Sequence, residues 1–438
     1  MLNHSYEHTN PRTSYTTRDQ FFELLPPVET DTLYRINSYS SRRSHTLTGE
    51  YTYYLLLNGI FQLHLIAESE WQYALLRGGT EQALSDGRLH NFSGFGYGND
   101  LQHRLIRNSL GTALKINLGR WTNTITLQPM WLKQQIQASD TTLSRNQLLL
   151  APKLTSKLEF SNGGRLNLNY NLGTTFPRLD DIATGASLSA YNLIKQGNSA
   201  LFYELYHNLS LNYQRFKLAT TSHFFTNLTM QLRENTIRHA VDYSGILPQQ
   251  SAFMSDHPAY SIILMSNYGR RYGAFRPSLS ARIHAFQYDQ KINGQDQTVD
   301  QLNYMYQFAL RYFTRTRGAL QVQYRYSSNS LRGLSKTQFS NRSITAQLDL
   351  RLSKQLLVKP VYSLVATRFV GQSDEQYHGL DLAVQYQLGK RGWSAIFDAY
   401  NLLDKSSRYQ SRLGDYYRME SETRVMPRVW LLGIGYQL

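Results

Sequence analysis

Residues 163–173, GGRLNLNYNLG, alternate strictly between polar and apolar side chains. Leu166, Leu168 and Tyr170 fall on one face of an extended strand, and Asn167 and Asn169 fall on the other, because successive side chains of a strand point to opposite sides. Such a strand either packs its apolar face against a protein core or turns that face to lipid in a membrane β-barrel. The choice between a soluble sandwich and a barrel decides the fold.

The same alternation returns along the chain. It is clear at 320–326 (LQVQYRY), 344–352 (ITAQLDLRL) and 380–388 (LDLAVQYQL), and helical periodicity is nearly absent. The sequence therefore predicts an all-β chain. In a barrel, the residues expected to face lipid are Leu166, Leu168, Tyr170, Leu348, Leu350, Leu382, Val384 and Tyr386, and those expected to face the lumen are Asn167, Asn169, Gln347, Asp349 and Gln385.

Short and longer connections alternate between the expected strands. The short turns are at 58–59, 119–120, 161–164, 214–216, 269–274, 314–317, 352–355 and 389–392. The longer connections are 75–108, 136–144, 175–200, 233–257, 290–299, 329–337, 370–376 and 404–425. Asn58-Gly59 is the strongest hairpin signal, and a two-residue Asn-Gly turn takes positive φ at both residues. Tight periplasmic turns and long extracellular loops are typical of outer-membrane barrels, so the alternation favours an antiparallel transmembrane barrel.

About 17 strands follow from residue 43 onward by this reading. We expect residues 43–438 to form the barrel wall and residues 1–42 to form an irregular N-terminal segment with one possible further strand, giving about 17–18 strands in all.

Composition agrees with a barrel. The 438 residues include 32 Tyr, whose rings and hydroxyls suit membrane interfaces. Mean hydropathy is −0.46, as expected when lumen residues cancel lipid-facing ones, and no run of about 18 apolar residues predicts a membrane helix. The N-terminus has no signal-peptide pattern.

The net charge of +15 comes from scattered residues without a nucleic-acid motif, so lipopolysaccharide phosphates are a more plausible partner than nucleic acid.

Motifs that could carry chemistry are weak. The glycines of GFGYG at 94–98 lack the strand and helix of a dinucleotide site, which favours a flexible loop tip. Asp180, Asp181 and Glu204 could be imagined as a cation site, but they do not form the ligand pattern of a calcium loop, and solvated loop acids are the simpler interpretation. The 12 histidines have no zinc-motif spacing, no cysteine is present, and no serine lies in a G-x-S-x-G elbow. We predict no metal, no cofactor and no enzyme activity.

Three segments carry a family resemblance. The segment that begins with FPRLDD leads to a strand with the pattern GN..L..E...N..L.Y, at Gly197, Asn198, Leu201, Glu204, Asn208, Leu211 and Tyr213. FDAYNLLDK (397–405) contains Asn401 and Asp404, with Leu403 in place of a Phe, and MPRVWLLGIGYQL closes the chain, with Pro427, Arg428 and Leu438 in place of a terminal aromatic. In this order they resemble the barrel of TonB-dependent outer-membrane receptors, especially those of Bacteroidetes.

The resemblance implies import across the Gram-negative outer membrane of a scarce large ligand, such as a siderophore, a corrinoid or a glycan, with energy relayed from TonB. The ligand would contact the extracellular loops 75–108, 175–200, 233–257 and 404–425. Family barrels have 22 strands around a plugged lumen, so we expect this chain to be the C-terminal part of a barrel, without plug or TonB box, and its wall to be open or narrower. A passive porin or structural barrel, and an adhesin, are the alternatives.

Overall fold

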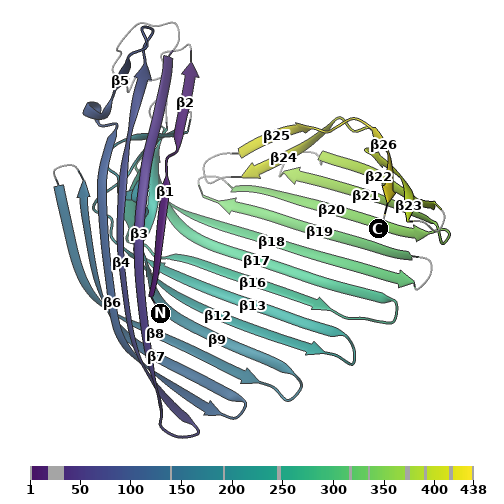
Figure 1. Cartoon of the computed structure of the whole chain (residues 1–438), viewed down its shortest axis with the longest axis horizontal. Helices are drawn as coiled ribbons and strands as arrows, with labels where there is room; N and C mark the ends of the chain where they lie inside the picture. Colours follow the sequence, from purple (N-terminus) through teal and green to yellow (C-terminus); the bar gives the residue numbers. More distant parts are fainter. Residues whose placement is uncertain are drawn as a thin grey trace.

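The chain is almost entirely extended and forms one large twisted wall (Figure 1). The computed structural model describes residues 2–17, 34–138, 141–190, 193–243, 248–314, 318–333, 336–369, 375–388, 392–413 and 418–436. Within these ranges the helical elements are the single α-turn α1 (Leu179–Ile182) and the 3-10 turn η1 (Ser93–Phe95), and no helix is long and apolar enough to cross a membrane. The predicted all-β class is confirmed.

Eighteen strand positions follow one another around the wall in the described ranges, because β1 and β2 share the first position beside β3. In order they are β1 (Leu2–Thr9) with β2 (Arg12–Thr17), β3 (Tyr34–Leu56), β4 (Phe61–Ala83), β6 (Gly98–Leu118), β7 (Trp121–Ala138), β8 (Thr141–Glu159), β9 (Gly164–Thr175), β12 (Glu204–Lys217), β13 (Ser222–Glu234), β16 (Ala259–Gly269), β17 (Phe275–Ile292), β18 (Gln295–Thr314), β19 (Gly318–Arg332), β20 (Lys336–Arg351), β21 (Leu356–Phe369), β22 (Glu375–Leu388), β23 (Trp393–Tyr400) and β26 (Val429–Tyr436). Each position pairs antiparallel with the next. The expected number of about 17–18 strands is confirmed.

The remaining strands are short and belong to the longer connections, all at one end of the wall. They are β5 (Leu89–Asn91), β10 (Ser187–Ala190), β11 (Leu193–Gln196), β14 (Thr236–Asp242), β15 (Gln249–Ser255), β24 (Ser407–Leu413) and β25 (Arg418–Arg424). Three of them form two short parallel pairings, β11 with β15 and β14 with the long strand β17. By the rule that extracellular loops are the long ones, this end is the extracellular one.

Several connections differ from their predicted limits. Residues 214–216 lie inside β12, which turns only after Lys217. The predicted connections 136–144 and 290–299 are mostly strand, because β7, β8, β17 and β18 extend well beyond the 9–11 residues that cross a bilayer. These hairpins therefore project beyond the bilayer as two-stranded ribbons, and the predicted connections were longer than the observed ones.

The hairpin predicted at Asn58-Gly59 is present between β3 and β4, but its turn has a different conformation from the one expected. Neither Asn58 nor Gly59 has a positive φ. Instead, the Asn58 side chain accepts hydrogen bonds from the amides of Ile60 and Phe61, both at 2.8 Å, so the turn is built by an asparagine side chain. Positive φ at both residues of an Asn-Gly pair occurs at Asn293 (49°) and Gly294 (78°), which join β17 to β18.

The register carries one apolar face around the wall. Paired residues of neighbouring antiparallel strands point to the same side, and one such row is Leu168, Leu211, Leu228, Leu264 and Ile283. Followed in this way across every pairing, the predicted lipid-facing residues all share this face and the predicted lumen-facing residues share the other. The two predicted sets are confirmed as opposite faces.

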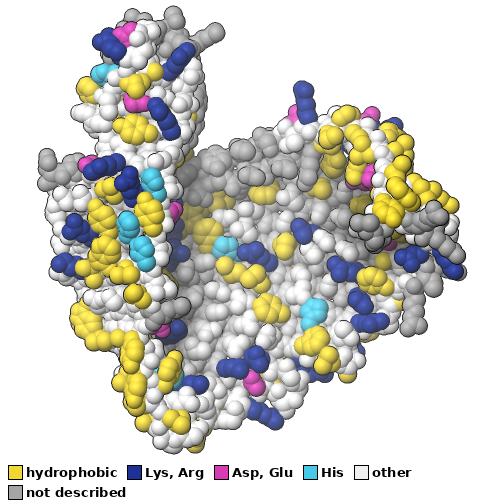
Figure 2. All heavy atoms as spheres, viewed as in Figure 1, with side chains coloured by type: hydrophobic (Ala, Val, Ile, Leu, Met, Phe, Trp, Pro, Cys, Tyr) yellow, Lys and Arg dark blue, Asp and Glu magenta, His cyan; other side chains and the backbone are white. Residues whose placement is uncertain are grey.

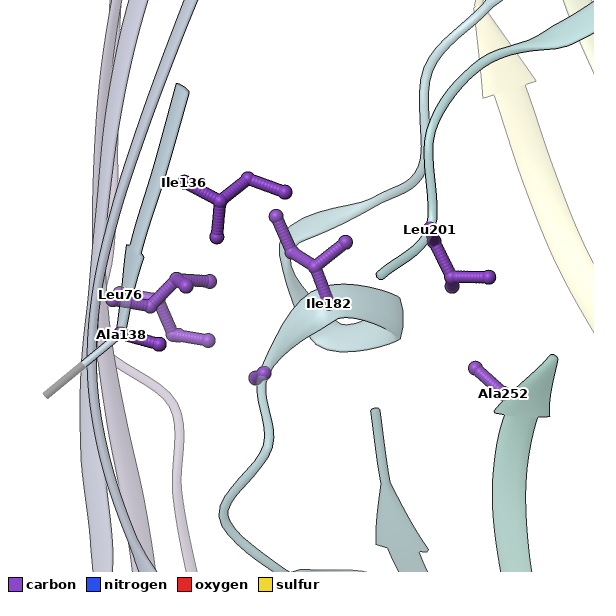
Figure 3. Packing of buried hydrophobic residues seen from close by; sticks show 8 residues of the cluster. Leu76, Ile136, Ala138, Ile182, Leu201 and Ala252 are labelled. Carbon is purple, nitrogen blue, oxygen red and sulfur yellow. The ribbon is translucent and has the colours of Figure 1, made fainter. Parts of the chain in front are cut away.

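Packing identifies which face is the inner one. Helix α1 packs against Leu76 of β4, Leu101 of β6 and Ala138 of β7, which the register places on the face opposite the apolar row. Figure 3 shows α1 between these strands and β15, so this face is the lumen side. The large apolar side chains of the outer face, among them Trp131 and Leu110, are exposed, as a lipid-facing surface requires.

The wall has two free edges. The β1–β2 position pairs with β3, and β26 pairs with β23, and across the described residues they do not pair with each other, so the sheet is not closed (Figure 1). Residues 2–9, 12–17 and 34–42, where we expected an irregular segment with one possible further strand, are strand. Their polar composition hid the alternation, since these strands lie partly beyond the apolar band.

Candidate functional site

One long connection folds into the lumen instead of extending outward. Residues 176–203, which we call the inward-folded loop, contain α1, β10 and β11. Ile182 (0% exposed) and Leu201 (2% exposed) pack between Ile136 of β7 and Ala252 of β15 (Figure 3). The loop is thereby held between the β4–β7 side of the wall and the β14–β15 hairpin.

A buried carboxylate, Asp181, holds the loop through contacts with Arg178, Lys195 and His239, which together we call the clasp. The side chain of Asp181 is 6% exposed. Its Oδ1 accepts hydrogen bonds from Lys195 Nζ at 2.9 Å and His239 Nε2 at 3.0 Å, and its Oδ2 accepts one from Arg178 Nε at 3.1 Å. Burial by itself would raise the pKa of Asp181, but these hydrogen bonds and the positive charges outweigh it and hold the pKa well below its usual range. The clasp joins α1, β11 and β14.

The family-motif residues Gly197 and Asn198 build the backbone of the clasp. The amide of Gly197 donates to Ala183 O and that of Asn198 donates to Asp181 O, both at 2.7 Å. A Cβ atom at Gly197 would lie 2.5 Å from Ala183 O and 2.6 Å from its N, closer than carbon can approach. Only glycine allows the chain to pass so close to α1.

Glu204 fixes the next segment. It is 6% exposed, its Oε1 accepts a hydrogen bond from the amide of Ile237 at 2.6 Å, and its Oε2 lies 3.4 Å from Arg233 Nη1. Asp181 and Glu204 are therefore buried structural acids, and their interpretation as solvated loop acids was wrong. Their loop is covered because it folds inward.

The third predicted acid, Asp180, pairs with Arg42 of β3 at 2.6 Å and 2.8 Å. This pair borders a cavity of about 230 Å³ between the inward-folded loop and β2–β4, which Ser38, Ser40 and Lys195 also line. Sites for drug-sized ligands measure roughly 300–1,000 Å³, so the cavity is small for such a molecule. No group of three or more metal-ligating side chains occurs among the described residues.

The sequence suggested that the GFGYG segment is a flexible loop tip, but the structure packs it against the inward-folded loop. Phe92 (0% exposed) and Tyr97 (8% exposed) pack with Leu188 and Ile194 of the inward-folded loop, and the amide of Ala186 donates to Gly96 O at 2.8 Å. Phe92 and Tyr97, within and beside this glycine-rich stretch, form a small hydrophobic core that the glycine pattern alone did not predict. The connections after β4 and β9 are thus packed together.

The closing motifs form the base of the last hairpin. Asn401 adopts a positive φ of 52°, and its Nδ2 donates to Lys405 O at 2.9 Å and Met426 O at 2.8 Å. Asp404, also at φ 52°, accepts a hydrogen bond from the amide of Arg428 at 3.2 Å. The side chain of Asn401 thus joins the two ends of the connection that carries β24 and β25.

The other motif residues lie on the wall. Asn208 faces the lumen, with its Nδ2 3.4 Å from Asn171 Oδ1, and Leu211 faces outward in the apolar row. Tyr213 faces outward near the turns, beside Phe160. Pro427 lies between Met426 and the start of β26, and Leu438 lies outside the described residues.

Of the four loops predicted to contact a ligand, the structure brings three together. The connections at 75–108, 175–200 and 233–257 meet through Phe92, Leu188 and the Asp181–His239 contact. The fourth, 404–425, forms the separate two-stranded sheet of β24 and β25. Sequence reasoning missed Arg178, Lys195 and His239, because no local pattern links partners 14 and 58 residues from an acid.

Replacing Gly197 with alanine is expected to undock the inward-folded loop. The added Cβ must displace the backbone of Ala183, and overpacking of this kind costs about 1–3 kcal/mol. The chain has no cysteine, so a spin label on Thr184→Cys, an exposed loop position, should report increased mobility. Gly59→Ala is the control, because no atom lies within 4 Å of a Cβ there. An immobile label in G197A would contradict the prediction.

The clasp is expected to weaken only in acid. The pKa of Asp181 is lower when docked than when free, so the ionised carboxylate stabilises docking fully above its free pKa of about 3.9 and loses that contribution as pH falls through the lower, docked pKa. The same spin label should stay immobile from pH 7 to about pH 4 and gain mobility below. In Asp181→Asn this acid-dependent step should disappear, and an unchanged step would assign it to another group.

Comparison with solved structures gives distant similarities, all at TM-scores below 0.5. The siderophore receptor PirA from Pseudomonas aeruginosa is 11% identical, with a TM-score of 0.34 over 92% of this chain and 73% of that one. The copper transporter OprC is 9% identical, with a TM-score of 0.41 over 99% and 80%. OmpT, an outer membrane protein of Vibrio cholerae, is 11% identical, with a TM-score of 0.27 over 93% and 98%.

Sequence comparison gives a family. No curated protein sequence matches this chain significantly. The model of the outer membrane protein beta-barrel family matches residues 128–436, which is more than half of the chain and extends from β7 to β26. It includes the inward-folded loop and the three motifs that carried the resemblance. The chain therefore belongs to the outer membrane protein beta-barrel family, and its place is the outer membrane of the cell.

Proposed function

We propose that the protein is a receptor that takes up a scarce ligand, too large for an open pore, with energy relayed from TonB. The observation that supports this proposal best is the inward-folded loop. It is held inside the lumen by one buried carboxylate with three cationic or histidine partners and by an apolar cluster on both sides. A loop fixed in this way restricts passage unless a ligand or a partner releases it.

The ligand would enter from the extracellular end, where the three packed connections lie. Binding can move the loop only if the ligand interacts better with the undocked arrangement than with the docked one. A siderophore, a corrinoid or a glycan presents enough polar groups to compete for Arg42 and Lys195, which line the inner cavity. The TonB complex is the proposed energy source by resemblance to the receptor family.

The test is growth on single ligands. Strains that carry or lack the gene, each with and without tonB, would be supplied with ferric siderophores, cobalamin or maltodextrins as the limiting nutrient. We expect growth on one ligand class to require both genes. Growth that requires this gene but not tonB would contradict the proposal.

A passive pore is the second candidate, and the same loop favours it, since a loop folded into a lumen also narrows a diffusion channel. Proteoliposome swelling separates the two. Swelling in arabinose and sucrose by the wild-type protein would support the pore, whereas a receptor with its loop docked should admit neither sugar.

A further inference from the structure

Three cations lie unpaired on the outer face of the wall. Arg43 of β3, Arg104 of β6 and Lys133 of β7 are exposed, and the register places them on the same side as Trp71 and Trp131, opposite to the lumen residue Leu76. Among the described residues none of the three forms an ion pair with a carboxylate. We call these three residues the outer cationic patch.

Nearby acids do not neutralise the patch. Glu50 of β3, Glu7 of β1 and Glu70 of β4 lie on the same or neighbouring strands, but the register points them to the lumen. Asp100 also lies on the outer face, but its Oδ1 is 3.2 Å from Arg77 Nε, so these two charges pair with each other. His4, His8 and His45 also lie on the outer face beside the patch, and none of them is an acid.

The patch lies at the height of lipid headgroups. Its residues are 12 to 14 positions from the ends of their strands at the short turns, Leu56, Leu118 and Trp121. A rise of about 3.4 Å per residue and a tilt near 45° place them about 30 Å above the turns, whereas the apolar band of such a barrel is about 25 Å tall. The cations therefore border the outer edge of the hydrocarbon.

Aromatic rings support the cations. The guanidinium carbon of Arg104 lies 5.7 Å from the centre of the Tyr73 ring, and Trp71 stacks on Tyr73 at 6.3 Å. Tyr6 and His45 pack beside them, at 4.7 Å between ring centres. Figure 2 shows histidine, basic and hydrophobic side chains gathered over β1, β3 and β4. Rings and cations together are typical of a membrane interface.

A groove lies between the patch and the turns, and Trp131, two residues from Lys133 on the same face, lines it. Small residues, Gly49, Ala67 and Ser69, leave a depression of about 740 Å³ between the exposed side chains of Leu110 and Trp131. These positions are closer to the turn ends than the patch, within the upper half of the apolar band by the same geometry. An acyl chain would lie in such a groove with its headgroup at the cations.

We propose that this face binds a phosphorylated, acylated lipid of the outer leaflet, the lipid A part of lipopolysaccharide. The phosphates would bind Arg104, Lys133 and Arg43, and one acyl chain would occupy the groove. Charge and shape support this proposal, because the unpaired cations lie at headgroup height above a groove that Leu2, Leu110 and Trp131 line. It rests on the outer-membrane location and not on the proposed transport.

The test uses the full chain, purified in detergent and titrated with lipid A that carries or lacks its phosphates, with bound lipid counted by native mass spectrometry. Each cation near an anionic surface contributes about 1 kcal/mol, and 1.4 kcal/mol is tenfold. Arg104→Glu with Lys133→Glu should therefore weaken binding of phosphorylated lipid A by about tenfold or more. Ala67→Phe, which fills the groove, should weaken both lipids.

The matched control is Arg120→Glu with Lys217→Glu, the same charge change at the turn end of the wall, and it should bind like the wild type. Heat-modified electrophoretic mobility confirms folding of each variant. Equal loss in the control, or unchanged binding in the Arg104 and Lys133 variant, would overturn the proposal. So would displacement of the lipid by millimolar inorganic phosphate, which would show that the groove contributes nothing.

Discussion

Asp181→Ala is expected to release the inward-folded loop and to open the lumen. Removing the carboxylate leaves Lys195, with 14% of its side chain exposed, and His239 without their shared acceptor. Breaking a buried ion pair on one side costs about 3–5 kcal/mol, because the remaining charge is buried alone. A loss of this size should leave the docked arrangement of the loop as the minority state. Single-channel conductance in planar bilayers should rise, and the Thr184→Cys label should become mobile.

Asp180→Ala is the matched control for this variant. It removes a neighbouring acid from the same α-turn, but the Asp180–Arg42 pair is 31% and 40% exposed, and exposed pairs contribute about 0–1 kcal/mol. Conductance should stay near the wild-type value. A second variant, Asp181→Leu with Lys195→Leu, removes both charges and should recover part of the docking. If Asp180→Ala opened the lumen as far as Asp181→Ala, the clasp would not be the element that holds the loop.

The wall was predictable from the sequence because its physics is local. Side chains of a strand alternate with a period of two, so LNLNY at 166–170 states which residues share a face without any knowledge of partners. The order of the strands followed from the same source, since neighbours in sequence are neighbours in the sheet. The limits of the connections at 136–144 and 290–299 were wrong because polar hairpins project there beyond the apolar band, where neither face is constrained by lipid.

The site could be predicted only in part. The resemblance selected Gly197, Asn198 and Glu204 as motif positions, but their role, which is to hold Asp181 beside Lys195 and His239, depends on a loop that folds back into the lumen. Its direction is set by contacts between segments far apart in the chain, such as Phe92 with Leu188. No single stretch of sequence contains that information. The acids therefore looked solvated, although the fold buries them.

Leu228→Arg is expected to be among the most damaging single changes in the wall. Leu228 lies six residues from the turn end of β13, near the middle of the apolar band, and pairs with Leu211 and Leu264 on the outer face. Arginine at that depth on the lipid face costs about 2–4 kcal/mol. Asn227→Arg, one residue away, points into the lumen beside Asn212 and should cost far less. Urea titrations in lipid vesicles would measure both.

The depth dependence gives this prediction a second test. Leu348 faces lipid as well, but it is only three residues from Arg351, where β20 ends at its turn. An arginine there can reach the headgroups along its own side chain, so Leu348→Arg should cost less than Leu228→Arg, since the cost falls toward about 0–1 kcal/mol near the interface. A harmless Leu228→Arg together with a ruinous Asn227→Arg would mean that the faces are inverted. Equal costs at 228 and 348 would mean that the outer face does not meet a bilayer of the expected height.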